Sequence, residues 1–181
     1  MFHRQGTLFA QAFDAKKLVF TGQPNHVADD LVADSNGRGE FDVSQNGVLL
    51  YVQGGRGAGP SGRGRTAGYQ LGWLERTGRA AGYVGDLGPY GDFDLSPEGT
   101  RVATTKQDTG ASGADIWTWD IKTGVPARLT RDPADDVDPV WSWPTGDRIA
   151  FTTYRKGNAD IYVKNANGVG DDMPLVASAA N

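Results

Sequence analysis

Three serines recur at one position of a repeated pattern and are the first residues to test as nucleophiles: Ser44, Ser96 and Ser142. The chain holds only two histidines, His3 and His26, and none of the serines lies in a Gly-x-Ser-x-Gly context. A catalytic serine occurs once and needs a base within hydrogen-bonding distance, whereas a structural serine can recur in every repeat. The recurrence therefore predicts that the hydroxyls hold local backbone at turns, and no catalytic residue is expected.

Metal and cofactor chemistry find little support in the sequence. The chain has no cysteine, and the densest acidic run, Asp132–Asp138, lacks the glycine and closing glutamate of an EF-hand calcium loop. Gly57, Gly59 and Gly62 have the spacing of a dinucleotide fingerprint, but arginines and glycines follow them in place of a helix. A solvated connection and a long loop explain the two segments better, so no metal site and no cofactor are expected.

A third set of residues suits binding rather than catalysis. An acidic side chain stands at the same place in three repeats, directly before a short strand-like segment: Glu40, Asp92 and Asp138, which lie 52 and 46 residues apart. Carboxylates gathered at one mouth of a channel favour a cation, an amine or a basic peptide segment over an anion. The bland alternative is that the three side chains cap separate turns and stay solvated. Which of these two roles applies depends on how the strands that carry the three side chains are arranged.

Three short segments recur at a fixed period and predict strands. Residues 70–75, 115–120 and 160–165 start 45 residues apart, and each is apolar or aromatic and ends in Glu, Asp or Asn. A glycine-containing turn follows each of them, because the acid or amide can hydrogen-bond the turn backbone and glycine accepts a positive φ. In the second copy, Asp120 is expected to stabilise the turn before Gly124.

A second pattern precedes each of these segments and predicts a strand, a tight turn and another strand. Its three copies begin at Phe41, Phe93 and Pro139, and each carries its serine just before the turn. The third copy has one extra residue, assigned to Trp143, which is expected to be exposed. A fourth, outer strand is expected after the second hairpin of each unit, over residues 80–84, 127–130 and 174–177.

Four strands per unit at about this period are typical of propeller blades, and no segment has helical periodicity over ten residues. The predicted fold class is all-β, a β-propeller of four-stranded antiparallel blades. About three and a half blades are present, so the propeller is expected to be incomplete, because closure needs roughly four to eight blades. The predicted boundaries within one partial propeller domain are 1–36 for a half blade of outer strands, then 37–88, 89–136 and 137–181 for whole blades.

The half blade and the last blade are expected to leave edges and faces uncovered. Residues 7–14 match the third-strand pattern, and residues 18–20 and 26–28 can supply an outer strand, so two inner strands would be absent. Unpaired edges and exposed apolar faces promote pairing with other chains. Self-association through blade edges is therefore expected.

The repeats resemble those of TolB-type, WD-repeat-like β-propellers. The resemblance rests on Ser96–Ala103 with Asp115–Trp117, and on Asp135–Ser142 with Arg148–Phe151 and Asp160–Val163. It covers nearly the whole chain from Leu8. The resemblance implies a propeller fold, a protein or peptide partner, and a setting in the periplasm or cell envelope. The sequence has no signal peptide at its start and no membrane-spanning run, and it leaves the compartment open.

A narrower resemblance joins Leu8–Asp14 with Phe41–Tyr51. Together they are similar to propellers appended to bacterial membrane-anchored serine/threonine kinases, although the chain contains neither a His-Arg-Asp loop nor an Asp-Phe-Gly motif. Since the chain starts at a third strand, it is expected to be the C-terminal portion of a longer propeller or a truncated product. The aromatic residues at repeated strand positions are expected to pack between blades; they are Trp73, Trp117, Trp119, Trp141 and Tyr162.

Net charge and the absence of catalytic motifs limit the functions that the chain could have. The formal net charge of −4 disfavours a nucleic-acid partner and an anionic membrane surface. We therefore expect a non-enzymatic binding or sensory module that contacts a protein or peptide through one propeller face. The alternative is the propeller portion of a serine peptidase or other hydrolase, which gates substrate to a catalytic domain outside this chain. An in-blade glycosidase is disfavoured because no carboxylate pair stands out.

The first strand of a blade is the innermost, so Glu40, Asp92 and Asp138 are expected to line one mouth of the central channel. The loops on the same face lie farther out and carry basic side chains. The expected arrangement is a negative centre with a positive rim; the rim residues are Arg56, Arg63, Arg65, Lys106, Arg155 and Lys156.

Overall fold

The computed structural model describes residues 1–33, 37, 39–54, 69–74, 79–88 and 90–177. Every regular element among these residues is a β-strand, and they include no helix that could cross a membrane. The glycine-rich segment with Gly57, Gly59 and Gly62, and the rim residues Arg56, Arg63 and Arg65, lie outside the described residues.

The strands form four antiparallel sheets. The first sheet has three strands, in the order β1 (Phe2–Arg4), β2 (Thr7–Asp14) and β3 (Val19–Ala28). The second has β4 (Phe41–Val43), β5 (Leu49–Gly54), β6 (Tyr69–Leu74) and β7 (Ala80–Gly88). The third has β8 (Tyr90–Leu95), β9 (Arg101–Lys106), β10 (Asp115–Asp120) and β11 (Pro126–Arg128). The fourth has β12 (Asp136–Trp141), β13 (Arg148–Thr153), β14 (Asp160–Asn165) and β15 (Met173–Val176).

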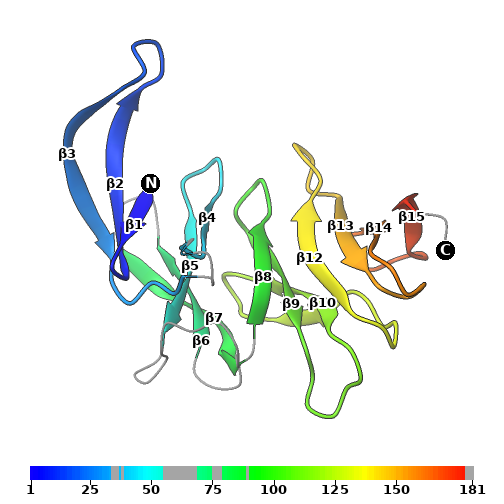
Figure 1. Cartoon of the computed structure of the whole chain (residues 1–181). Coiled ribbons are helices and arrows are strands. Elements are labelled where there is room, and N and C mark those ends of the chain that lie inside the picture. Colours follow the sequence, from blue (N-terminus) through cyan, green and yellow to red (C-terminus); the bar gives the residue numbers. More distant parts are fainter. Residues whose placement is uncertain (34–36, 38, 55–68, 75–78, 89, 178–181) are drawn as a thin grey trace.

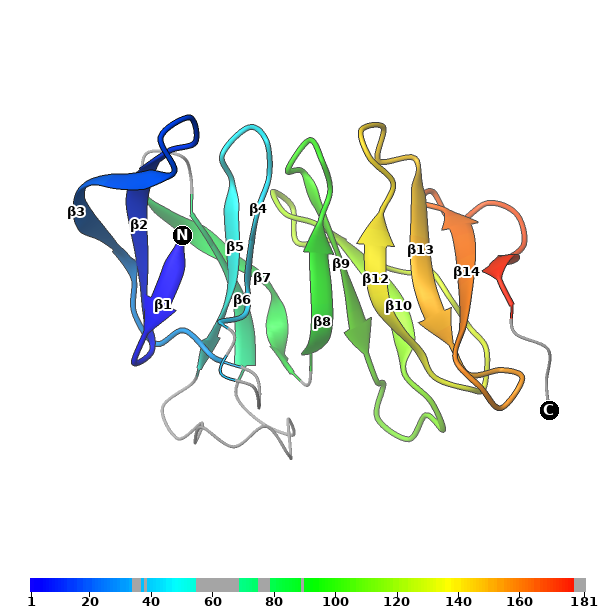
Figure 2. The same cartoon turned by 45° about the horizontal axis from the view of Figure 1, so that its top comes forward.

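The sheets follow one another in chain order, as blades do in a propeller (Figures 1 and 2). Each four-stranded sheet is a meander in which sequential strands pair, and the last strand leads directly to the first strand of the next sheet. The first strand β8 lies beside the first strands of both neighbouring sheets, β4 and β12. The predicted fold class, an incomplete β-propeller of four-stranded antiparallel blades, is confirmed.

The first sheet differs from the expected pair of outer strands. Residues 18–20 and 26–28 both fall in or beside the single long strand β3, which is irregular where its register with β2 shifts. A strand that was not predicted, Phe2–Arg4, supplies one of the two inner strands expected to be missing. Gln5 and Gly6 join it to β2, and both adopt a positive φ, of 51° and 80°. Three residues are too few for alternation to be recognised in the sequence.

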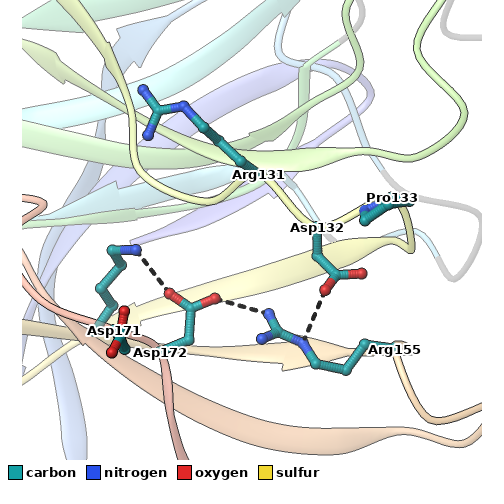
Figure 3. A pocket seen from close by; sticks show the side chains of 7 residues that line it. Arg131, Asp132, Pro133, Arg155, Asp171 and Asp172 are labelled. Carbon is teal, nitrogen blue, oxygen red and sulfur yellow. Dashed lines mark hydrogen bonds and ion pairs between the residues drawn. The ribbon is translucent and has the colours of Figure 1, made fainter.

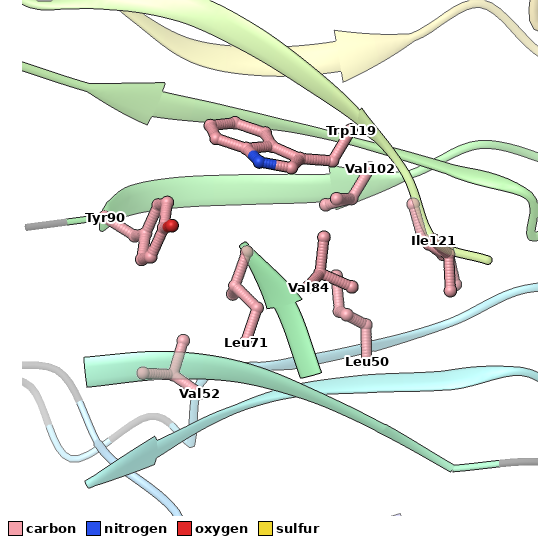
Figure 4. Packing of buried hydrophobic residues seen from close by; sticks show 9 residues of the cluster. Leu50, Val52, Leu71, Val84, Tyr90, Val102, Trp119 and Ile121 are labelled. Carbon is pink, nitrogen blue, oxygen red and sulfur yellow. The ribbon is translucent and has the colours of Figure 1, made fainter. Parts of the chain in front are cut away.

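Each pair of neighbouring sheets encloses its own hydrophobic core, so the sheets are joined by side-chain packing rather than by a shared strand ladder. The cluster between the second and third sheets is shown in Figure 4 and consists of Leu50, Val52, Leu71, Val84, Tyr90, Leu95, Val102, Trp119 and Ile121. The cluster between the third and fourth consists of Ala103, Ile116, Leu129, Trp141, Ile149, Phe151, Tyr162 and Ala166. The cluster between the first and second consists of Leu8, Ala28, Leu31, Leu49, Tyr51 and Leu74.

The repeated aromatic residues pack between blades as predicted. Trp119 belongs to the cluster between the second and third sheets, and Trp73 and Trp117 pack against it. Trp141 and Tyr162 belong to the cluster between the third and fourth sheets. The Arg101 guanidinium of the third sheet lies 4.5 Å from the ring centroid of Trp141 in the fourth. Trp143, the extra residue of the third turn, is 60% exposed, also as predicted.

The recurring serines hold their turns. The Oγ atom of each accepts a backbone N–H at the start of the next strand, or directly before it in the case of Ser44: Val48 to Ser44 at 2.9 Å, Arg101 to Ser96 at 3.0 Å and Arg148 to Ser142 at 3.0 Å. A hydroxyl that binds the turn backbone in this way, at the same position of three sheets, serves the fold. The structural role predicted for these serines is confirmed.

Turns of successive blades also touch one another, and a glycine makes this possible. Gly99 has a φ of 66°, and a Cβ built on it would lie 2.6 Å from Ser44 Oγ in the preceding blade. The Asn46 amide in that blade donates a hydrogen bond of 2.6 Å to the Glu98 carbonyl. Only glycine combines the left-handed backbone with this close approach.

Asp120 stabilises the turn that follows β10, as predicted. Its Oδ1 accepts hydrogen bonds from the Thr123 N–H and hydroxyl, both at 2.8 Å, and its carbonyl accepts the Gly124 N–H. These bonds lower the pKa of the carboxyl, because they favour its charged form.

We expect Asp120→Ala to reduce the free energy of unfolding by ~0.5–2 kcal/mol, as the loss of a comparable side-chain cap does. Chemical denaturation followed by Trp fluorescence measures this change. Asp120→Asn, which keeps an acceptor oxygen, should lose less, and Lys122→Ala in the same exposed turn should be near neutral. An unchanged unfolding midpoint for Asp120→Ala would contradict the structural role.

Candidate functional site

Acidic side chains follow the innermost strands of the propeller, and we call them the inner acidic row. It comprises the three predicted residues and two further aspartates: Glu40, Asp42, Asp92, Asp94 and Asp138. Asp42 and Asp94 were not predicted as site residues. A signal for them exists, since both follow the phenylalanine of the strand–turn pattern, but the third copy has Val140 there and breaks the regularity.

Asp42 and Asp94 tie each innermost strand to the next. The Leu95 N–H donates to Asp42 Oδ2 at 2.9 Å, and the Trp141 N–H donates to Asp94 Oδ2 at 2.6 Å. The Trp141 indole Nε1–H also donates to the Asp94 carbonyl at 3.1 Å. An N–H on the open edge of a sheet has no strand partner, so the neighbouring carboxylate takes the place of the missing ladder.

The tie places two carboxylates close together. Burial raises the pKa of Asp94 to about 6, and the charge and hydrogen bond of Asp42 add to this, while the Trp141 N–H acts in the opposite direction. Two neighbouring carboxylates resist simultaneous ionisation. Asp94 therefore holds its proton more tightly than an isolated aspartate does.

Asp92 and Asp138, two of the three predicted binding residues, come together. Partial burial raises the pKa of Asp138, and the nearby Asp92 carboxylate adds to this. Asp138 sits at an irregularity of β12 with a φ of 54°, and its N–H donates to Thr105 Oγ1 at 3.2 Å. The bulge turns this aspartate toward the neighbouring blade.

Glu40 is the third predicted residue and stands directly before β4. Its N–H donates to the Val32 carbonyl at 2.9 Å, and its carbonyl accepts the Val52 N–H at 3.0 Å. Within the described ranges, no three acidic or histidine side chains gather in a way that could hold a metal ion. That Glu40, Asp92 and Asp138 act jointly at a channel mouth stays a prediction.

The expected positive rim is weaker than predicted where it is described. Lys106 pairs with Asp108 at 2.5 Å and lies 4.4 Å from the ring centroid of Trp117. Arg155 is held among carboxylates and lies over Tyr162, 4.4 Å from its ring centroid. Cations that are already paired contribute little net field around the mouth.

A pocket of about 400 Å³ lies near the edge between the third and fourth sheets (Figure 3). It is lined by Arg131, Asp132, Pro133, Arg155, Lys164, Asp171 and Asp172. These residues come from the connection before β12, the connection after β13, strand β14 and the connection before β15.

The charges in this pocket neutralise one another. Arg155 contacts Asp172 at 2.9 Å and Asp136 at 3.3 Å, and Lys164 contacts the other oxygen of Asp172 at 2.8 Å. Burial disfavours the charge of Asp172, but the hydrogen bonds from Lys164 and Arg155 outweigh it and lower its pKa. The pocket is therefore an ion-pair network that joins blade elements, and its charged groups are not poised for acid–base chemistry.

We compared the chain with known proteins. No family model matches it. An uncharacterized peptidase, YuxL of Bacillus subtilis, is 33% identical over 82 residues, which cover 42% of this chain and 12% of that protein. The Tol-Pal system protein TolB of Desulfosudis oleivorans is 34% identical over 55 residues, which cover 30% of this chain and 12% of that protein.

A solved structure extends the likeness to nearly the whole chain. The putative TolB of Agrobacterium tumefaciens superposes with a TM-score of 0.68 at 19% identity, over 98% of this chain and 57% of that one. The chain thus has the fold of TolB-type propellers, as the sequence resemblance implied, and it spans only part of the length of these proteins. The narrower resemblance to propellers appended to kinases stays a prediction.

The Asp94 carboxyl should make stability depend on pH. Its folded pKa of about 6 lies above the ordinary aspartate value of 3.8, so between about pH 4 and 6 the folded chain keeps a proton that the unfolded chain has lost. This contribution to stability is full below about pH 4 and is lost as the pH rises through about 6. We expect Asp94→Asn, which is neutral and keeps an acceptor oxygen, to raise the melting temperature at neutral pH more than at acidic pH.

Differential scanning calorimetry at about pH 4.5 and 7.5 tests this. Asp147 provides a matched control, because hydrogen bonds from Thr145 and Ser142 lower its pKa. Asp147→Asn should therefore lower the melting temperature at neutral pH. If Asp94→Asn shifts the melting temperature equally at both pH values, the buried carboxyl does not control the pH dependence.

Proposed function

We propose that this chain is a non-enzymatic β-propeller module that binds a basic segment of a protein or peptide at the acidic mouth of its channel. The observation that carries the proposal is the contact between Asp92 and Asp138 on the neighbouring first strands β8 and β12. Both side chains belong to exposed residues, so a partner can reach them.

Asp92 and Asp138 place two like charges close together. A proton or a cation between two neighbouring carboxylates relieves their repulsion. A lysine or arginine side chain of a partner would supply that cation. Such complementarity contributes both to the rate of association and to the choice of partner.

Two further features support binding without catalysis. The recurring serines are engaged in turns, and the strongest cluster of ion pairs is neutralised internally. The Tol-Pal system protein TolB, to which part of the chain is similar, carries in its name a link to a protein assembly. A protein partner is the interpretation that agrees with all three.

A second candidate function is the propeller portion of a hydrolase that gates substrate to a separate catalytic domain. It is favoured by the similarity of 82 residues to an uncharacterized peptidase. The flanking coding sequence decides between the two candidates. A downstream domain with a nucleophile elbow would support the hydrolase, whereas a membrane helix next to a kinase domain would support a sensory binding module.

The binding proposal predicts the effect of removing two charges. The variant Asp92→Asn/Asp138→Asn should bind a short oligolysine peptide about tenfold more weakly than wild type, since close charge pairs at interfaces commonly contribute at least 1.4 kcal/mol. Adding Glu40→Gln should weaken binding further. Isothermal titration calorimetry at low salt, where screening is smallest, measures the effect.

The variant Asp86→Asn/Asp171→Asn is a matched control, because it removes the same charge from two exposed aspartates outside the inner acidic row. Its affinity should stay close to that of wild type. Equal affinities for all the proteins would show that the mouth binds no basic segment and that its acids only cap turns.

A further inference from the structure

The hairpin formed by β2 and β3 is longer than the corresponding hairpins of the third and fourth sheets. Strand β2 has eight residues and β3 has ten, whereas β10 and β11 have six and three, and β14 and β15 have six and four. At a rise of about 3.4 Å per residue, the extra residues extend the hairpin well beyond the usual length. In Figure 1 its tip stands above the turns of the other sheets, so a neighbouring blade of the same height would not cover it.

The tip of this hairpin, residues 13–20, is apolar although it is exposed. Phe13 and Phe20 pair across the ladder with ring centroids 5.4 Å apart, and Leu18 and Val19 lie at the turn. The exposed fractions are 50% for Phe13, 66% for Phe20, 74% for Leu18 and 47% for Val19. Apolar side chains gathered in this way mark a surface that contacts another molecule.

One of these apolar residues occupies a position that suits glycine. Asp14 Oδ1 accepts the Lys17 N–H at 3.0 Å, as Asp120 accepts the N–H three residues on in the turn after β10. The next residue has a positive φ in both turns, 55° at Leu18 and 69° at Gly124. The left-handed conformation is unfavourable for leucine and cheap for glycine. Because an exposed leucine gains little from core packing, this strain points to a role in binding.

Two lysines accompany the apolar side chains. Lys16 and Lys17 are exposed at the turn, and the one acidic residue of the tip is Asp14. One Asp14 oxygen accepts the N–H groups of both lysines at 3.0 Å, and the other lies 3.9 Å from Lys17 Nζ. The tip is therefore cationic, whereas the whole chain has a formal net charge of −4.

We propose that the tip of the β2–β3 hairpin inserts into the surface of an anionic lipid bilayer. Phe13, Leu18 and Phe20 enter the boundary between headgroups and acyl chains, and Lys16 and Lys17 contact the lipid phosphates. Binding at this boundary increases with the apolar area that is buried and with electrostatic attraction to anionic lipids. The tip supplies both contributions within eight residues.

The arrangement of the apolar side chains favours a bilayer over the groove of a protein. Phe13 and Phe20 lie on one face of the hairpin. Val19 pairs with Asp14 and therefore lies on the opposite face, and Leu18 is in the turn between the strands. Acyl chains can surround a projection that is apolar on several sides, whereas a groove covers one face of an inserted segment. The long lysine stems can also extend along the apolar surface while their ammonium groups stay at the headgroups.

The acidic residues of the channel mouth lie away from this tip. The tip is on the side of the β4–β5 and β8–β9 turns (Figure 1), whereas Glu40, Asp92 and Asp138 lie before or in the first half of the innermost strands. The net charge of the whole chain disfavours general adsorption to an anionic surface. It does not decide how a projecting cationic tip meets that surface.

Co-sedimentation with vesicles tests the proposal. The full chain should bind vesicles of phosphatidylglycerol and phosphatidylcholine more tightly than vesicles of phosphatidylcholine alone. Lys16→Ala/Lys17→Ala should weaken binding to the anionic vesicles about tenfold, since each basic residue near such a surface contributes to binding. Lys122→Ala removes a charge from the corresponding turn after β10 and should leave binding unchanged.

The leucine at the left-handed position separates binding from folding. Leu18→Gly should keep or raise the melting temperature, because glycine relieves the strain. It should still weaken vesicle binding about tenfold, the loss expected for one buried leucine side chain. Val125→Ser removes an apolar side chain that is 61% exposed in the corresponding turn after β10, and it should bind vesicles as wild type does. Leu18→Gly should also bind oligolysine as wild type does, so this proposal and the proposed function can fail separately.

A single fluorescent label locates the insertion. The chain has no cysteine, so Leu18→Cys can carry one environment-sensitive NBD group, and Val125→Cys can carry the same group as a control. Anionic vesicles should shift the emission of the label at position 18 to shorter wavelength and leave the label at position 125 unchanged.

Three results would overturn the proposal. The first is equal binding of wild type and the tip variants to anionic vesicles. The second is no binding to vesicles of either composition, which would assign the tip to the groove of a protein partner. The third is an emission shift at position 18 without vesicles, in step with self-association seen by light scattering, which would assign the tip to a second copy of the chain.

Discussion

Blades of a propeller are separate sheets, so no backbone ladder joins one blade to the next. The hydrogen bond from the Trp141 N–H to Asp94 joins two neighbouring blades in place of such a ladder. Together with the bond from the Leu95 N–H to Asp42, it fixes the spacing and register of the innermost strands. The hydrophobic clusters between the second and third sheets and between the third and fourth sheets can then form at a fixed spacing. Packing alone is non-directional, whereas the carboxylate tie specifies which residue faces which.

These hydrogen bonds to Asp42 and Asp94 also concentrate carboxylates along the innermost strands. Each tie is made by a carboxylate on an innermost strand. Burial raises the pKa of Asp94, and the nearby Asp42 carboxylate adds to this. Farther out, charges are arranged differently: Arg155 and Lys164 are paired with Asp136 and Asp172. The innermost strands thus carry closely spaced carboxylates, whereas Arg155, Lys164 and Asp172 form ion pairs with one another.

The repeats were visible in the sequence because each blade needs the same local chemistry. A serine that caps a turn, as Ser96 does, and an aspartate that holds one, as Asp120 does, act on backbone a few residues away, so spacing alone reveals them. The tie from Asp42 to Leu95 joins residues 53 positions apart, and the length of the intervening loops hides it. Strand β1 was not predicted, because three residues are too few to show an alternation of apolar and polar side chains.

The two ends of the row of ties are not alike, and this asymmetry follows from single residues. At the fourth sheet the aspartate is replaced by Val140, which is 56% exposed, so this strand offers no carboxylate to a further innermost strand. At the first of the innermost strands, by contrast, the Val43 N–H donates to Asp42 of its own strand and not to an aspartate of another strand. This local bond satisfies the N–H, so a tie between innermost strands arises only where the neighbouring strand supplies the aspartate.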